Sequence, residues 1–358
     1  MSDDYEAVVR GPKSEAVASF GERRDPVARI QHALHVNPAL VPLFVLLVSI
    51  VLFGALLGSK FFSPFALTLI LQQVQIVGIV AAAQSLVILT AGIDLSVGAI
   101  AVLSSVIMGQ FTFRYGIPVE VSIAIGLAFG ALVGTINGWL VAVMRLPPFI
   151  VTLGMWQIVL AANFLYSANE TIRSQQIEAD APLLQFLGST FKVGADAEGR
   201  GGATFTYGVI AMVLIFAVLA YALRQTAWGR HIYAVGDDPD AAQLSGVNVR
   251  WTIISVYAVT GFICAIAGWA LIGRIGSVSP TSGQLLNIES ITAVVIGGIS
   301  LFGGRGSIMG PLFGALIVGV FTLGLRLAGA DAQWTFLLIG VLIIGAVAVD
   351  QWIRKVSA

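Results

Sequence analysis

The residues best suited to chemistry lie in the run AGIDLSVG, Ala91 to Gly98, where an aspartate separates two long apolar stretches. An ionised carboxylate at the centre of a membrane helix costs roughly 2.5–3.5 kcal/mol on insertion scales. Asp94 is therefore expected at a helix end or in a break lined by protein, and both positions are typical of functional residues. Gly92, Asp94, Ser96 and Gly98 define this motif.

Side-chain amides within the apolar stretches form a second group of candidates. An amide both donates and accepts hydrogen bonds, as a neutral polyhydroxylated solute requires, and an aromatic ring offers an apolar face. At 100° per residue, Gln73 and Gln84 fall within about 20° of each other on a helix. For each amide, hydrogen bonding between helices is the alternative explanation. The candidates for a solute path are Gln73, Gln84, Asn137, Trp156, Gln157 and Asn163.

The sequence lacks the residue patterns that nucleotide hydrolysis, metal binding or an internal disulfide would require. No run has the form G-x-x-x-x-G-K-[ST], which nucleotide-splitting proteins use to hold phosphates. The three histidines, His32, His35 and His231, lack the spacing of metal ligands, and the single cysteine, Cys264, allows no disulfide within the chain. We therefore expect no catalytic residue, no metal site and no cofactor in this chain, so that any pumping would draw its energy from a partner.

The composition sets the fold class. Hydrophobic residues make up 57% of the 358 residues and charged residues only 11%, whereas soluble domains have about 25% charged residues. The apolar runs repeatedly reach about 20 residues, the length at which a helix crosses a bilayer. Strands of about ten residues with alternating polarity, which a membrane barrel requires, are not visible. The sequence thus predicts an all-α fold, a polytopic transmembrane helical bundle.

About ten spans are expected, some of them broken or short. The eighth is the weakest, because its continuously apolar part, 291–301, is too short to cross a bilayer at 1.5 Å per residue. It either takes in polar residues such as Asn287 and Glu289 or is a half-helix. The predicted spans are Ala39–Leu57, Phe65–Thr90, Val97–Phe113, Val119–Val143, Phe149–Tyr166, Phe205–Leu223, Trp251–Gly273, Gln284–Leu301, Ile308–Ala328 and Gln333–Val349.

Positive charge orients the predicted bundle. With the amino terminus inside, 12 of the 19 Lys and Arg residues fall on cytoplasmic segments, as the positive-inside rule favours. The transmembrane domain is then 39–349, between cytoplasmic tails at 1–38 and 350–358. It carries a periplasmic segment at 167–204 and a cytoplasmic loop at 224–250. Those 12 residues are Arg10, Lys13, Arg23, Arg24, Arg29, Arg145, Arg224, Arg230, Arg250, Arg305, Arg354 and Lys355.

The cytoplasmic loop carries helix-end signals in GDDPDAAQLSGV. Asp238 suits an amino-terminal cap, Pro239 the first helical position and Gly246 the residue after the end. They predict a short helix, Pro239–Ser245, outside the membrane. Aspartate-rich loops also bind prenyl diphosphates in membrane transferases, but this cluster has no second acidic motif.

Ordered glycines predict close helix packing. Gly126, Gly130, Gly134 and Gly138 recur every four residues in the fourth span, and Gly310 and Gly314 repeat the spacing in the ninth. A moving gate is the alternative. The runs GIDLSVG and GISLFGG both follow a long apolar stretch, as do the helix breaks of transporters with internal repeats, although two similar glycine-rich turns would also explain them.

Three features together resemble the permease subunits of bacterial monosaccharide ABC importers. They are the run AGIDLSVG, the run GGISLFGGRGSIMGP from Gly297 to Pro311, and the capped loop helix. The resemblance covers the chain from about Pro38 to its end. Within this ribose, xylose, arabinose and fructose group, the sequence is most similar to the fructose import permeases. No residue chemically separates fructose from ribose or xylose.

The resemblance implies a division of labour in the bacterial inner membrane. A periplasmic sugar-binding protein captures the monosaccharide, two permease subunits, expected to be a homodimer, form the path, and two ATP-binding subunits bind the ATP; no nucleic acid is involved. Gly236–Val247 would be the coupling helix that contacts the ATPase, and 167–204 would contact the binding protein unless it is a flexible loop. The coupling residues would be Asp237, Asp238, Pro239, Asp240, Ala241, Gln243 and Gly246.

Asp94 would then lie in a partly buried turn near the moving gate, capping the following helix rather than touching sugar. Two other classes stay open at this point. One is a secondary sugar carrier that works alone, and the other is a membrane-embedded transferase.

Overall fold

The computed structural model describes residues 39–194 and 202–357. The predicted amino-terminal tail, 1–38, lies outside the described residues. Within them, eight helices are long and apolar enough to cross a membrane, judged by length and composition. They are α3 (Leu40–Leu57), α4 (Pro64–Leu89), α5 (Val97–Tyr115), α6 (Val119–Ala142), α7 (Pro148–Ser167), α9 (Tyr207–Gln225), α12 (Val249–Ile275) and α14 (Met309–Leu327).

Helix ends follow the capping chemistry of the sequence. Ser63 precedes α4, and its hydroxyl accepts a hydrogen bond from the N–H of Ala66 at 3.1 Å, while Pro64 takes the first helical position. Gly116 ends α5 and Gly276 ends α12, both with positive φ, a conformation that costs glycine little. The predicted helical bundle is therefore confirmed, with most span boundaries within two or three residues of those expected.

Two helices differ from the predicted spans. The eighth is α13 (Leu286–Ile296), whose 11 residues reach about 16 Å, roughly half of a 30 Å hydrocarbon layer. It ends early because Gly298 takes a φ of 76° that starts a turn. The last helix, α15 (Ala332–Ser357), continues past the predicted end of the span at Val349.

The polar segment after α7 is folded over its described residues. It forms α8 (Ser174–Asp180), the 3₁₀ helix η2 (Pro182–Gly188) and an antiparallel pair, β1 (Thr190–Val193) with β2 (Ala203–Thr206). Gly188 meets the backbone of Gly273 in α12 so closely that a side chain would collide there. This part is therefore attached to the end of α12.

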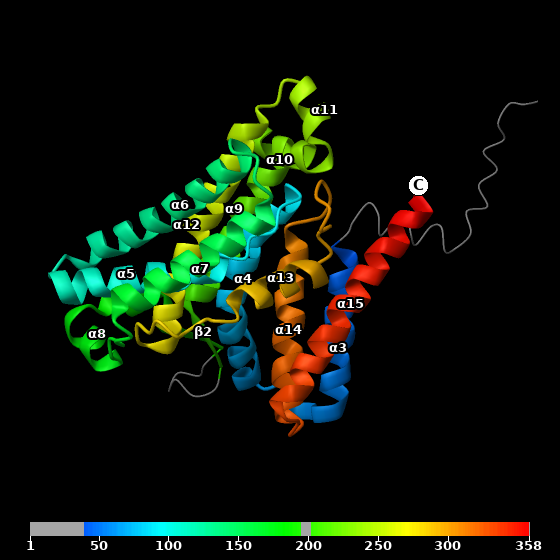
Figure 1. The fold of residues 1–358 in the computed structure, drawn as a ribbon. Helices are drawn as coiled ribbons and strands as arrows, with labels where there is room; N and C mark the ends of the chain where they lie inside the picture. Colours follow the sequence, from blue (N-terminus) through cyan, green and yellow to red (C-terminus); the bar gives the residue numbers. More distant parts are fainter. Residues whose placement is uncertain (1–38, 195–201, 358) are drawn as a thin grey trace, which may run out of the picture. The chain divides into compact units, whose positions relative to one another are not determined.

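Helix α4 is central, because it packs against α9, α12, α13 and α14 (Figure 1). The predicted glycine face of α6 packs on α12. A Cβ placed on Gly130 would lie 2.5 Å from the Gly261 carbonyl oxygen, and one on Gly138 would lie 2.8 Å from the Ile254 Cα. Close packing, the expected use of these glycines in a membrane, is what the structure shows.

Two short helices stand at one end of the bundle, α10 (Ala227–Asp237) and α11 (Pro239–Leu244). The turn between α4 and α5 and the loop between α13 and α14 lie at this same end, whereas α8 and β2 lie at the other (Figure 1). The two ends are called below the α11 end and the α8 end.

Candidate functional site

Asp94 lies in the turn that joins α4 to α5. Its carboxylate Oδ1 accepts hydrogen bonds from the N–H of Ser96 at 2.7 Å and from its hydroxyl at 2.6 Å. The Gln84 amide, oriented so that both of its polar groups are bonded, donates to the Asp94 carbonyl oxygen at 3.0 Å and accepts from the Asp94 N–H at 3.2 Å. The structure thus fixes both the side chain and the main chain of Asp94.

The expected partial burial of Asp94 is wrong, because the side chain is only 1% exposed. Burial raises its pKa to about 6, and the two hydrogen bonds from Ser96 offset part of that rise. The expected capping takes a different form: the carboxylate bonds Ser96, the N-cap residue of α5, rather than a later N–H of the helix. The sequence indicates that Asp94 lies in a turn, but it does not show that other helices pack over this turn and bury the side chain.

Two other helices hold the same turn. The Asn137 amide, from α6, donates to the Ser96 hydroxyl at 3.0 Å. The Thr152 hydroxyl, from α7, donates to the Ile93 carbonyl oxygen at 2.9 Å. The motif AGIDLSVG is therefore a fixed structural element that four helices share.

The second glycine motif meets this turn directly. In the loop between α13 and α14, the Gly304 N–H donates to the carbonyl oxygen of Leu89, the last residue of α4, at 3.0 Å. Gly303 and Gly304 both have positive φ. A Cβ on Gly303 would lie 2.7 Å from the Ala91 nitrogen, and only glycine permits this approach. The two predicted helix breaks are thus in backbone contact.

Helix α10 joins the same contact. Gly236 lies against the Leu89 carbonyl so closely that any side chain would collide, and a Cβ on Gly304 would lie 2.8 Å from the Asp237 Cα. The Tyr233 hydroxyl also donates to the Gly306 carbonyl oxygen at 2.9 Å. The three segments 89–91, 236–237 and 303–304 are called the glycine junction.

Helix α11 follows the glycine junction and points away from the bundle (Figure 1). Asp238 caps it as predicted, since its Oδ1 accepts from the N–H groups of Asp240 at 2.9 Å and Ala241 at 3.0 Å. The helix ends at Leu244, one residue earlier than expected. Leu244 is 90% exposed, so α11 presents an apolar side chain among acidic ones.

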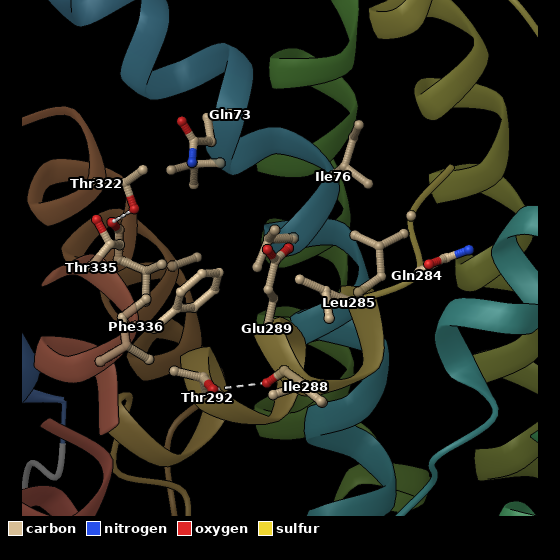
Figure 2. Close-up of a pocket in the computed structure, with 18 of the residues that line it drawn as sticks. Gln73, Ile76, Gln284, Leu285, Ile288, Glu289, Thr292, Thr322, Thr335 and Phe336 are labelled. Carbon is tan, nitrogen blue, oxygen red and sulfur yellow. Dashed lines mark hydrogen bonds between the residues drawn. The ribbon is translucent and has the colours of Figure 1, made fainter. Parts of the chain in front are cut away.

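A pocket of about 1080 Å³ lies away from the glycine junction, among α4, α13, α14, α15 and the end of α12. Figure 2 shows Gln73, Glu289, Thr322, Thr335 and Phe336 around one hollow. Among the described residues, its ionisable lining consists of Arg274, Glu289, Arg326 and Asp331.

The six predicted path residues are spread over the bundle. Gln73 lines the pocket, whereas Gln84 and Asn137 hold the Asp94 turn. The Asn163 amide donates to the Pro280 carbonyl oxygen at 2.7 Å. Trp156 packs against the core, and Gln157 is exposed on α7. Their role in a solute path stays a prediction.

The charged residues of the pocket are not among the site residues that the sequence predicts. Glu289 was expected only as a polar residue at the start of a weak span, and Arg274 sits in the last turn of α12. An ionisable residue beside a span too short to cross was the available signal, because such residues in membrane proteins usually face a cavity.

The long apolar helices, the half-helix α13 and the interrupted motifs define a multi-pass membrane protein of the transporter class. Residues 66–347 match the family model described as "branched-chain amino acid transport system / permease component", and the chain belongs to that family.

Curated relatives cover most of the chain. It is 67% identical over 357 residues to the fructose import permease protein FrcC of Rhizobium meliloti. This match covers 100% of this chain and 97% of the relative. It is 36% identical over 297 residues to the ribose import permease protein RbsC of Escherichia coli K12, a match that covers 82% of this chain and 88% of the relative. It is 32% identical over 314 residues to the galactose/methyl galactoside import permease protein MglC of the same organism, a match that covers 81% of this chain and 88% of the relative.

Proposed function

We propose that the chain is the permease subunit of a binding-protein-dependent ABC importer that carries fructose across the bacterial inner membrane. The observation that carries this proposal is the 67% identity, over the whole chain, to a protein named a fructose import permease. The family description names branched-chain amino acids, but the relatives considered above are named for sugars.

In this function α11 is the coupling helix. It stands outside the bundle at the α11 end, and its exposed Leu244 and acidic residues offer an apolar contact within a charged rim to an ATPase cleft. The glycine junction supports this role, because α10 touches the end of α4 and the loop before α14 through backbone atoms. A displacement of α11 would therefore reach both helix breaks without passing through flexible side chains.

Other parts of the importer follow from this assignment. ATP would be hydrolysed by partner subunits, since the sequence has no phosphate-binding loop of the common form. Both termini would be cytoplasmic with the α11 end, and the α8 end would face the periplasmic sugar-binding protein. A second copy of the permease would complete the path.

The substrate is tested by uptake in cells that lack their own fructose importer. Labelled fructose should enter when the chain is expressed with its ATPase and binding protein. Unlabelled fructose should compete better than ribose, and leucine should not compete. Competition by leucine but not by fructose would contradict the sugar assignment.

The orientation is tested by crosslinking. In the full importer, Gln243→Cys should crosslink to a cysteine in the ATPase, whereas Thr171→Cys at the α8 end should not. Labelling of Gln243→Cys from the periplasm in intact cells would refute the topology.

A further inference from the structure

The pocket offers polar atoms that suit hydroxyl groups. The Thr322 hydroxyl donates to the Val318 carbonyl oxygen at 2.8 Å, and the Thr292 hydroxyl donates to the Ile288 carbonyl oxygen at 2.8 Å. Because each hydroxyl proton is used within its own helix, the oxygen lone pairs are what a solute meets as acceptors. Gln73, on the facing helix α4, adds an amide that can both donate and accept.

The charges of the pocket balance. Arg274 and Arg326 lie in the lining together with Glu289 and Asp331. With a formal sum of zero, the lining favours neither an anion nor a cation. Carboxylates and guanidinium groups together supply strong acceptors and strong donors, and a sugar hydroxyl uses both.

An aromatic ring completes this arrangement. Phe336, on α15, turns its ring toward the same hollow as the Glu289 carboxylate (Figure 2), and 65% of its surface is exposed. An exposed ring beside polar groups gives a solute one apolar face and one hydrogen-bonding face. A hexose ring has this division, since C–H groups lie on its faces and its hydroxyls lie around the edge.

We propose that this pocket is a hexose-binding station within the permease, in which Glu289 accepts hydrogen bonds from sugar hydroxyls and Phe336 covers the C–H face. The proposal rests on the sugar-import function proposed above. It places the station between the half-helix α13 and α15, away from most of the amides that the sequence put forward. The open rim, with exposed Leu285 and Ile288, suits brief binding rather than capture.

Occupancy is tested by thiol labelling. Cys264, the only cysteine in the chain, is buried, so a Thr335→Cys variant adds one accessible thiol in the pocket. In the purified full importer, fructose at twice its dissociation constant or more should slow its labelling by a small polar reagent about threefold or more, because about two thirds or more of the pockets would be occupied. Thr171→Cys, exposed at the α8 end, should label at the same rate with and without fructose.

Two labelling outcomes would overturn the proposal. One is an unchanged rate at Thr335→Cys at every fructose concentration. The other is protection by leucine and not by fructose, which would make the pocket an amino-acid site.

The role of Glu289 is tested by transport. Glu289→Gln should lower fructose uptake about tenfold, the loss expected for one charge-assisted hydrogen bond. ATP hydrolysis stimulated by the liganded binding protein should stay within about twofold, because the glycine junction is untouched. Phe336→Leu should also lower uptake, and Glu289→Asp should restore part of it. The matched control is Glu120→Gln, at an exposed residue in the first turn of α6, which should transport normally.

The outcomes distinguish failure of the sugar station from failure of the proposed import function. If wild-type importer carries fructose and both Glu289→Gln and Phe336→Leu carry it equally well, the pocket is not a sugar station. If Glu289→Gln lowers uptake and ATP hydrolysis together, Glu289 is structural and its proposed contact with sugar is wrong. If wild-type importer carries no fructose, the proposed function itself fails.

Discussion

At the scale of single residues, Asp94 shows how a charge can be retained inside a membrane protein for structural reasons. Its carboxylate is buried and accepts two hydrogen bonds from Ser96, which is itself bonded to Asn137. Asp94 therefore fixes the turn that the glycine junction uses.

Removal of the Asp94 carboxyl should destabilise the protein more than its neutralisation. Asp94→Ala leaves the buried N–H and hydroxyl of Ser96 without this acceptor, at a cost of about 1–3 kcal/mol. Asp94→Asn keeps an oxygen in the acceptor position and should cost less. Apparent melting temperatures in detergent will rank the variants, and a lower value for Asp94→Asn than for Asp94→Ala would contradict the hydrogen-bonding account.

The buried carboxyl also predicts a pH dependence. Burial raises the pKa of Asp94 from 3.8 to about 6, so the folded protein binds this proton more tightly than the unfolded chain does. The stability from protonation is fully present below pH 3.8 and is lost as the pH rises to about 6. The melting temperature of wild type relative to Asp94→Asn should therefore fall across this window. A difference in melting temperature that stays constant across this pH range would show that burial does not raise the pKa of Asp94.

At the scale of elements, the glycine junction links α10 to the two helix breaks by backbone contact. Its glycines are spaced far apart in the sequence, at 236 and 303–304, so no local pattern could have brought them together.

Gly236→Ala should lower the apparent melting temperature, because the new methyl group collides with the Leu89 carbonyl. Gly154→Ala is the control, since a Cβ there meets open space; equal behaviour of the two variants would refute the junction.

Helix α11 should bind the ATPase through its exposed tip. Leu244→Ser should weaken co-purification of the ATPase and leave the permease's own melting temperature unchanged, because Leu244 is 90% exposed and packs against little in the chain. Val193→Ser, at a 53% exposed residue of the α8 end, is the matched control. Normal co-purification with Leu244→Ser would remove the tip of α11 from the interface.

At the scale of the whole molecule, local signals predicted most of the fold. Apolar length located the long helices, and the Asp238, Pro239 and Gly246 signals gave α11 within one residue. Tertiary contacts decided what the sequence left open: α13 is a half-helix, Asp94 is fully buried, and Gln84 and Asn137 hold a turn. The pocket could not be predicted, because Gln73, Glu289 and Phe336 are brought together only by packing of α4, α13 and α15.

We propose that this chain imports sugar with energy from a partner. The most direct measurement is fructose uptake into proteoliposomes that contain the permease, its ATPase and the binding protein, with ATP supplied on the ATPase side. Uptake should require ATP, the binding protein and the ATPase together, and an ion gradient should not replace them. Uptake by the permease alone, driven by a proton or sodium gradient, would contradict the account.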